Sequence, residues 1–81
     1  MEYPALTPPQ LGAILRGFRK QRHLTQAQLG ARVGLPQNTI SVFESNPERC
    51  SVERLFRLLS ALEVELALQD RGPAAGQKPA W

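Results

Sequence analysis

The first hydrophobic positions of the chain recur at spacings of three and four residues, which is the pattern of one face of an α-helix. These positions are Leu11, Ile14, Leu15 and Phe18. Thr7 precedes them as a candidate N-cap, Pro8 suits a first helical residue, and Gln10 stands where a capping box takes Glu or Gln. The pattern predicts a helix over residues 8–21, with the basic residues off its apolar stripe.

A shorter helix is predicted next, and it begins at a second capping box. Thr25 and Gln28 repeat the spacing of the first pair, and Leu29 and Val33 form an apolar face one turn apart. Gly34 then supplies the left-handed residue that commonly ends a helix. We therefore expect the chain to turn sharply at this glycine.

A third helix is predicted from Pro36 and Gln37 to about residue 45. Ile40 and Phe43 are its inward positions. The helix ends before Pro47, because proline pushes the preceding residue out of helical geometry. Together with the second helix it forms a pair of short helices joined at a tight turn.

A fourth helix follows, capped by Ser51 and apolar over one broad face, of which the stripe Leu55, Phe56, Leu59 and Leu62 is expected to be core. Its apolar residues are Val52, Leu55, Phe56, Leu58, Leu59 and Leu62. The charged residues Glu53, Arg54 and Arg57 lie off that face.

The hydrophobic period then changes to two. Val64, Leu66 and Leu68 alternate with less apolar residues, which is typical of a short strand over residues 64–69. Continuation of the fourth helix is the competing interpretation, because Leu, Ala and Glu favour helix. A lone strand leaves unpaired backbone groups along its edges. We expect the same strand of a second copy to pair with it across a two-fold axis, which makes these three residues the dimerisation contact.

Glycine and proline are frequent from Arg71 onward, with almost nothing to bury. We expect residues 71–81 to form a disordered tail, and residues 1–70 to form one all-α domain of four to five helices with a short C-terminal strand. The tail ends in Trp81, the only tryptophan. Trp81 is either a chance terminal residue or an aromatic anchor for a partner's pocket, and the tail is alternatively a proteolytic handle.

The composition limits how such a domain is stabilised. A chain of 81 residues has a marginal core of its own, and it usually needs a disulfide, a metal or oligomerisation. Cys50 is the only cysteine and His23 the only histidine, which excludes an intrachain disulfide and a structural zinc site. Oligomerisation remains, in agreement with the expected homodimer.

Secretion, membrane attachment and catalysis are not expected. Glu2 stands where a signal peptide would carry positive charge, and no apolar run is long enough to span a bilayer. We therefore expect a cytoplasmic protein. Because the sequence offers no cluster of nucleophile, base or metal ligands, we expect neither an enzyme nor a cofactor, metal or small-molecule ligand.

Basic residues are concentrated in one part of the chain, where residues 16–32 contain no acidic residue. They are Arg16, Arg19, Lys20, Arg22 and Arg32. Such clustering favours a polyanion partner and makes them candidate phosphate contacts; a solvated helix face that happens to be basic is the alternative. Thr25 and Gln26 join this set, because backbone amides at the start of a helix favour a phosphate.

The start of the third helix carries side chains suited to reading bases. Gln37 and Asn38 can each form two hydrogen bonds with adenine in the major groove. Thr39 and Ser41 offer hydroxyl groups, and the threonine methyl can contact thymine. Glu44 would repel phosphate, so we expect it to be a structural acceptor near the end of the helix.

Residues 25–45 resemble the DNA-binding helix-turn-helix of the phage-repressor-like (Xre/Cro) family. The resemblance is carried by Gln26, Leu29, Val33, Gly34, Ile40, Ser41 and Glu44. It implies a phage-repressor-like helix-turn-helix domain. Gly30 departs from the family, which usually has alanine there, and this difference is expected to weaken the helix by roughly 1 kcal/mol.

A longer resemblance, to the HipB-type antitoxins, covers nearly the whole chain. It is carried by residues 7–11, 24–26, 37–47 and 58–63, by the strand at 64–69 and by the terminal tryptophan. It implies a dimeric autorepressor that binds a duplex DNA operator and neutralises a HipA-type serine/threonine kinase toxin. The family's base-reading positions fall on Pro36, Gln37 and Asn38, and proline departs from the polar residue that the family has there.

Two other functions stay open. A stand-alone phage-repressor-like transcriptional regulator would share the N-terminal two-thirds of the chain and have no toxin partner. The strand, the tail and Trp81 favour the antitoxin over this alternative. A protein-interaction module that does not bind DNA is the third candidate, and the basic stretch and the polar start of the third helix argue against it.

Overall fold

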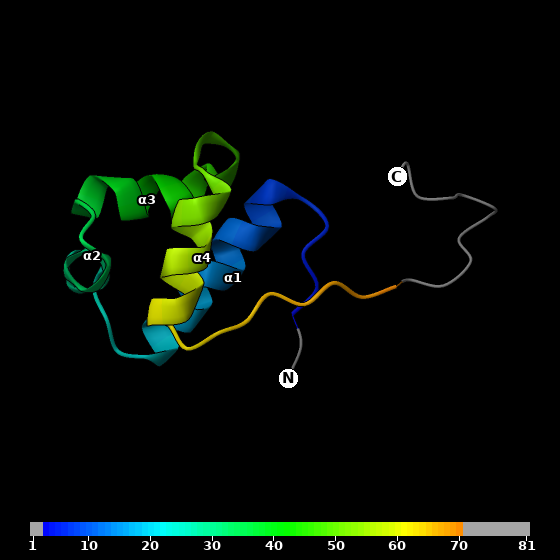
Figure 1. The fold of residues 1–81 in the computed structure, drawn as a ribbon, viewed down its shortest axis with the longest axis horizontal. Helices are drawn as coiled ribbons and strands as arrows, with labels where there is room; N and C mark the ends of the chain where they lie inside the picture. The colour runs from blue at the N-terminus through cyan, green and yellow to red at the C-terminus, as the bar shows by residue number, and fades with distance from the viewer. Residues whose placement is uncertain (1–2, 71–81) are drawn as a thin grey trace.

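Four α-helices surround a small apolar core in the computed structural model, which describes residues 3–70 (Figure 1). They are α1 (Pro8–Gln21), α2 (Gln26–Val33), α3 (Gln37–Ser45) and α4 (Val52–Ala61). A short 3-10 helix, η1 (Pro47–Arg49), joins α3 to α4 and was not predicted. The all-α prediction and the order of its four helices are confirmed.

Side chains just before the helices fix where three of them begin. The Thr7 hydroxyl accepts a hydrogen bond from the Gln10 amide at 3.3 Å, and the Gln10 side chain accepts one from the Thr7 amide at 3.1 Å. Thr25 and Gln28 form the same reciprocal pair at 3.1 and 2.9 Å. Ser51 caps α4 by accepting from the Arg54 amide at 3.2 Å. Both predicted capping boxes and the predicted Ser51 cap are confirmed.

Left-handed residues end three of the helices, and His23, with φ 57°, is the one that follows α1. Gly34 ends α2 with φ 71°, as predicted. Glu63 has φ 58° just after α4, so the chain leaves helical geometry there and residues 64–70 lie outside any helix. Continuation of the fourth helix is therefore wrong. Pairing of residues 64–69 with a second copy stays a prediction.

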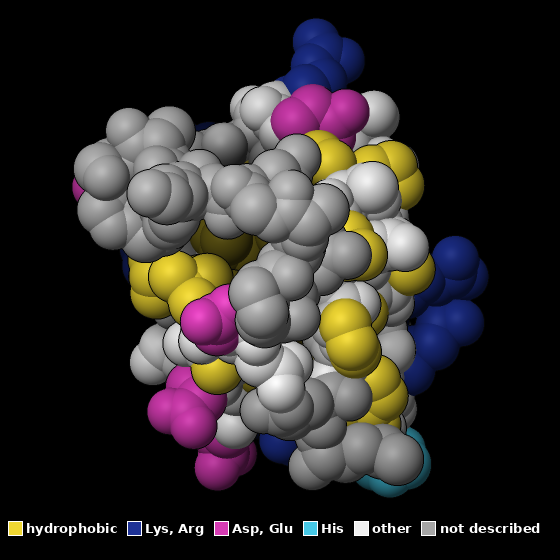
Figure 2. All heavy atoms as spheres, turned by 90° about the vertical axis from the view of Figure 1, so that its right-hand side faces the viewer, with side chains coloured by type: hydrophobic (Ala, Val, Ile, Leu, Met, Phe, Trp, Pro, Cys, Tyr) yellow, Lys and Arg dark blue, Asp and Glu magenta, His cyan; other side chains and the backbone are white. Residues whose placement is uncertain are grey.

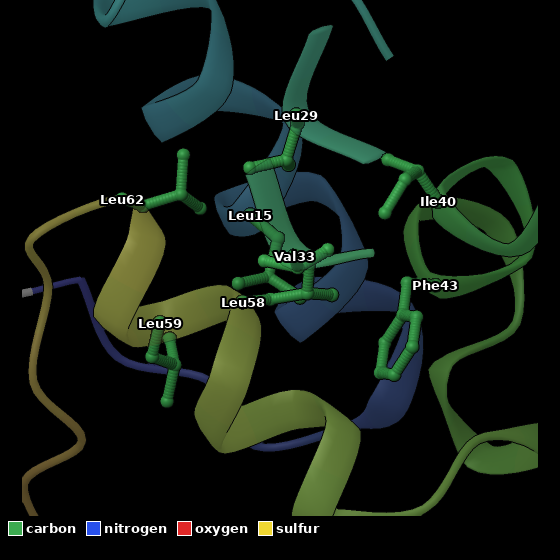
Figure 3. Close-up of a cluster of buried hydrophobic side chains, with 8 residues drawn as sticks. All are labelled: Leu15, Leu29, Val33, Ile40, Phe43, Leu58, Leu59 and Leu62. Atoms are coloured by element: carbon green, nitrogen blue, oxygen red, sulfur yellow. The ribbon is translucent and has the colours of Figure 1, made fainter. Parts of the chain in front are cut away.

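The core is formed by eight side chains that all four helices and the end of α4 contribute (Figure 3). They are Leu15, Leu29, Val33, Ile40, Phe43, Leu58, Leu59 and Leu62. The expected core stripe of α4 is wrong at Phe56, which is 49% exposed, and Val52, at the start of the same apolar face, is 66% exposed. These two residues lie on the flank of the helix, outside the sector that faces the other helices.

α1 and α3 approach each other closely at Gly12. A Cβ atom on this glycine would collide with the carbonyl group of Glu44. The absence of a side chain at residue 12 therefore lets α3 pack directly on α1.

Within residues 3–70, no helix is long and apolar enough to cross a membrane. The predicted tail, residues 71–81, lies outside the described residues together with Trp81, so the proposed domain boundary stays a prediction.

Candidate nucleic-acid interface

The turn between α2 and α3 is closed by backbone contacts. The Leu35 amide donates to the Gly30 carbonyl at 2.9 Å. A Cβ atom at Gly30 would lie 2.5 Å from the Leu35 carbonyl oxygen, so this position has no room for one. Arg57 of α4 also donates to the Val33 carbonyl at 2.9 Å, which ties the end of α2 to α4. Sequence reasoning missed this arginine, because its partner is a backbone atom 24 residues away.

The inner face of α3 is fixed and its outer face is free for contacts. Ile40 and Phe43 are each 1% exposed and anchor the helix in the core. Gln37 and Asn38, at its start, are exposed. Their side chains therefore project from a helix whose position is set by packing on its other side.

The remaining predicted base-reading residues, Thr39 and Ser41, are half-buried. Thr39 lines an open depression together with Asn38 and Val42 of the same helix. The Ser41 carbonyl accepts a hydrogen bond from the Ser45 hydroxyl at 2.9 Å. The structure thus brings Asn38 and Thr39 to one hollow beside α3.

Two basic residues that sequence reasoning missed line the same depression. Arg49 and Arg54 come from η1 and α4, with Cys50 and Ser51 between them. The phosphate contacts predicted from the sequence all lie within residues 16–32, where basic residues cluster without an acidic one. The distribution of charge along the chain does not show that Arg49 and Arg54 lie beside the exposed start of α3.

The start of α2 presents backbone amides next to two polar side chains. The first amide that bonds within the helix is that of Leu29, which donates to the Thr25 carbonyl at 3.0 Å. The amides of Gln26 and Ala27 precede it, and such first-turn amides are available to an anion. Thr25 is exposed and Gln26 half-buried at this end of the helix.

Arg19 does not belong to the exposed basic face, which corrects its prediction as a phosphate contact. It is 8% exposed. Its Nε and Nη2 atoms donate to the Glu44 carboxylate at 2.6 and 3.1 Å, and Nη1 donates to the Leu24 carbonyl at 2.8 Å. The Arg19 guanidinium therefore makes its hydrogen bonds inside the protein, and two of them form an ion pair that joins α1 to α3.

Glu44 serves two elements at once. Besides Arg19, it accepts a hydrogen bond from the Gln26 side-chain amide at 3.2 Å. The prediction of Glu44 as a structural acceptor is confirmed. Gln26 is thereby oriented at the start of α2, where its second amide hydrogen can donate to a phosphate or a base edge and its oxygen can accept from a base edge.

The other predicted basic residues divide into two groups. Arg16, Lys20 and Arg32 are exposed. Arg22 is also exposed, but its Nε donates to the Leu62 carbonyl at 3.0 Å, which ties the end of α1 to the end of α4. Arg22 thus has a structural contact that the charge pattern did not reveal.

Cys50 is half-buried and has a free thiol. Burial raises the pKa of this thiol, although the nearby Arg54 and Arg49 guanidinium groups lower it in part. The thiol therefore stays protonated at neutral pH, as expected of an ordinary structural cysteine.

The predicted dimerisation residues lie together after α4 but differ in exposure. Val64 packs against the core, whereas Leu66 is 47% and Leu68 93% exposed. Among the described residues, no group of three His, Cys, Asp or Glu side chains is placed to hold a metal ion.

Comparisons with known proteins agree with this geometry. The Helix-turn-helix family model matches residues 7–69. Antitoxin HipB of Escherichia coli O6:H1 is 38% identical over 64 residues, which cover 79% of this chain and 68% of that protein. A solved complex of a HipB variant with an O2 20mer has a TM-score of 0.81 at 34% identity, covering 88% of this chain and 99% of that one. A HipA-HipB-O2-O3 complex has a TM-score of 0.78 at 34% identity, covering 84% and 96% of the two chains.

Proposed function

This chain belongs to the helix-turn-helix family and to its HipB-like antitoxins, and from that premise we propose that it is a sequence-specific DNA-binding antitoxin that represses transcription as a homodimer and neutralises a HipA-type serine/threonine kinase. The observation that carries the DNA-binding part is the start of α3. Its exposed polar side chains stand on a helix that the core holds rigidly.

Base reading is assigned to Gln37 and Asn38, supported by Thr39 and Ser41. Amide side chains can bond adenine through both their donor and their acceptor. Such bonds discriminate between bases only when the side chain is held at a defined position, which the buried Ile40 and Phe43 provide. Pro36 precedes them as the N-cap and makes no side-chain cap hydrogen bond.

Phosphate contacts are assigned to the start of α2 and to a set of exposed basic residues. At the start of α2, the first backbone amides contact phosphate together with Thr25 and Gln26. The exposed basic residues that we retain or add are Arg16, Lys20, Arg22, Arg32, Arg49 and Arg54. Contacts of this kind position the protein on duplex DNA and make its affinity depend on salt, without carrying sequence information.

The DNA-binding proposal is tested with one base-reading and one phosphate variant. Gln37→Ala is expected to weaken binding to duplex DNA from the chain's own promoter by about 1–3 kcal/mol and to leave binding to a scrambled duplex unchanged. Lys20→Ala is expected to weaken both and to reduce the salt slope by about one unit. Fluorescence anisotropy at several salt concentrations measures both effects. Equal losses on the two duplexes for Gln37→Ala would contradict base reading.

The toxin partner is proposed from kinship with HipB, one of whose solved complexes contains HipA. We assign Trp81 as the anchor that enters a pocket of this kinase. Deleting residues 72–81 is expected to weaken binding to a HipA-type kinase encoded beside this chain and to leave DNA binding nearly intact. Co-purification and calorimetry measure the difference. A truncated chain that holds the kinase as firmly as the full chain would refute the anchor, and a chain that binds DNA but no kinase would be a stand-alone regulator.

A further inference from the structure

An apolar crevice lies between the N-terminal stretch and the outer face of α1. It has a volume of about 120 Å³ and is lined by Tyr3, Ile14, Gly17, Phe18 and Gln21. The Tyr3 and Phe18 rings meet edge to face, with 5.3 Å between their centroids and 88° between their planes. A Cβ atom at Gly17 would have no neighbour within 4 Å, so this wall of the crevice is open.

The crevice lies close to the beginning of the segment that follows α4. Arg22, one residue after Gln21 of the crevice, donates to the Leu62 carbonyl at 3.0 Å. The Val64 amide in turn donates to the Leu59 carbonyl at 2.9 Å, which holds the first residue of the segment against α4. Figure 1 shows the segment leaving α4 beside the last turn of α1, at the end of that helix opposite to the one where the N-terminal stretch enters it.

The segment carries apolar side chains that its own chain leaves uncovered. Leu68 is 93% and Leu66 47% exposed. Apolar side chains also appear on the face of the molecule seen in Figure 2, turned away from α2. Apolar side chains that gather on one exposed face are a candidate interaction surface.

Two-fold pairing would bring one copy's segment to the other copy's crevice. In an antiparallel pair centred on Leu66, Leu68 of one copy lies opposite Val64 of the other, and opposite residues point to the same side of the sheet. Val64 points to the core. Leu68 of the second copy would therefore point to the same side, beside the end of α1.

We propose that the crevice beside Tyr3 and Phe18 receives Leu68 of a second copy of this chain. The proposal rests on the homodimer of the proposed function and extends its interface from the paired strands onto α1. Strand pairing alone is a small contact, because it joins only two six-residue segments. Specific protein interfaces are larger and bury about 1,200–2,000 Å² in total. Seating an aliphatic side chain in each crevice adds apolar burial on both sides of the two-fold axis.

Disulfide trapping between two different chains tests the contact. One chain carries Gly17→Cys and the other Leu68→Cys, and both carry Cys50→Ser so that no native thiol competes. A disulfide forms only when the two Cα atoms come within about 7 Å. We expect mild oxidation of the mixture to yield the mixed cross-linked dimer as the main product, separated by non-reducing electrophoresis and identified by mass. The matched control replaces Leu68→Cys with Ala67→Cys, whose side chain points to the other side of the strand, and is expected to cross-link at least ten times more slowly.

A second measurement leaves Cys50 in place. Leu68→Asp is expected to raise the dimer dissociation constant at least tenfold in sedimentation equilibrium, with the helical circular dichroism of the unaltered chain. A dimer that survives Leu68→Asp, or equal trapping at residues 67 and 68, would overturn the crevice contact and leave the homodimer standing. An unaltered chain that sediments as a monomer would overturn both.

Trapping within a single chain that carries both cysteines, at high dilution, would assign the crevice to the chain's own Leu68 and overturn the proposal. DNA binding is measured separately, so its loss has no bearing on this test.

Discussion

At the scale of single residues, the ion pair between Arg19 and Glu44 joins α1 to α3. Both side chains are about nine-tenths buried, at 10% and 7% exposure. Removal of one partner from a buried pair leaves the other charge without compensation. The pair therefore links folding of α1 to placement of the helix that carries Gln37.

Arg19→Ala is expected to lower the free energy of unfolding by about 3–5 kcal/mol, because it leaves the Glu44 carboxylate buried and unpaired. Arg16→Ala, on the exposed face of the same helix, is the control and is expected to change it by less than about 0.5 kcal/mol. Urea denaturation followed by circular dichroism measures both. Similar values for the two variants would contradict the internal role of Arg19.

The same residue shows what a sequence can and cannot predict at this scale. The caps formed by Thr7, Thr25 and Ser51 were predictable, because each involves residues three positions apart. The partner of Arg19 lies 25 residues away, so charge alone placed this arginine among the phosphate contacts. One signal was available: residue 19 continues the spacing of the buried Gly12 and Leu15.

At the scale of elements, the turn from α2 to α3 depends on two glycines for different reasons. Gly34 adopts a left-handed backbone conformation, which residues with a side chain rarely adopt. Gly30 is helical, but the Leu35 carbonyl occupies the space of its Cβ atom. Propensity alone made Gly30 a weak point of α2, whereas the structure shows a close backbone approach that only glycine accommodates.

Gly30→Ala is therefore expected to destabilise the domain, although alanine gains about 1 kcal/mol over glycine in helix propensity. Gly17→Ala, at an open position of α1, is the matched control and is expected to gain about that amount. Both changes are made in the Leu68→Asp chain so that dimerisation does not contribute, and thermal unfolding compares them. A stabilising Gly30→Ala would show that the turn relaxes and that propensity decides.

The four helices were predictable as elements because each has an apolar stripe and a local start or stop signal. η1 was not, because its three residues are too few to show a period. The outer flank of α4 was also misjudged: Phe56 fits an apolar helix pattern, and only the placement of the other helices shows that nothing covers it fully.

At the scale of the whole molecule, the small core and the exposed leucines after α4 indicate a domain that is completed by association. Eight side chains make up its buried cluster. A folded state that is stabilised by binding a second copy gains stability as the protein concentration rises.

The melting temperature is accordingly expected to rise with protein concentration, by several degrees between 1 and 100 μM on an order-of-magnitude estimate. Leu68→Asp is expected to abolish this dependence, because it disfavours the associated state. Differential scanning calorimetry at several concentrations measures the effect. A melting temperature independent of concentration in the unaltered chain would mean that the domain is stable as a monomer.

The separation of the two faces of α3 has a consequence for how this protein changes over generations. Ile40 and Phe43 secure the helix from one side, while Gln37 and Asn38 protrude from the other and take no part in the core. Descendants can thus acquire a preference for new regulatory sequences through replacements that leave folding intact. After a gene duplication, single substitutions at these positions can give each copy a preference for its own promoter. The two copies in one genome would then no longer repress each other.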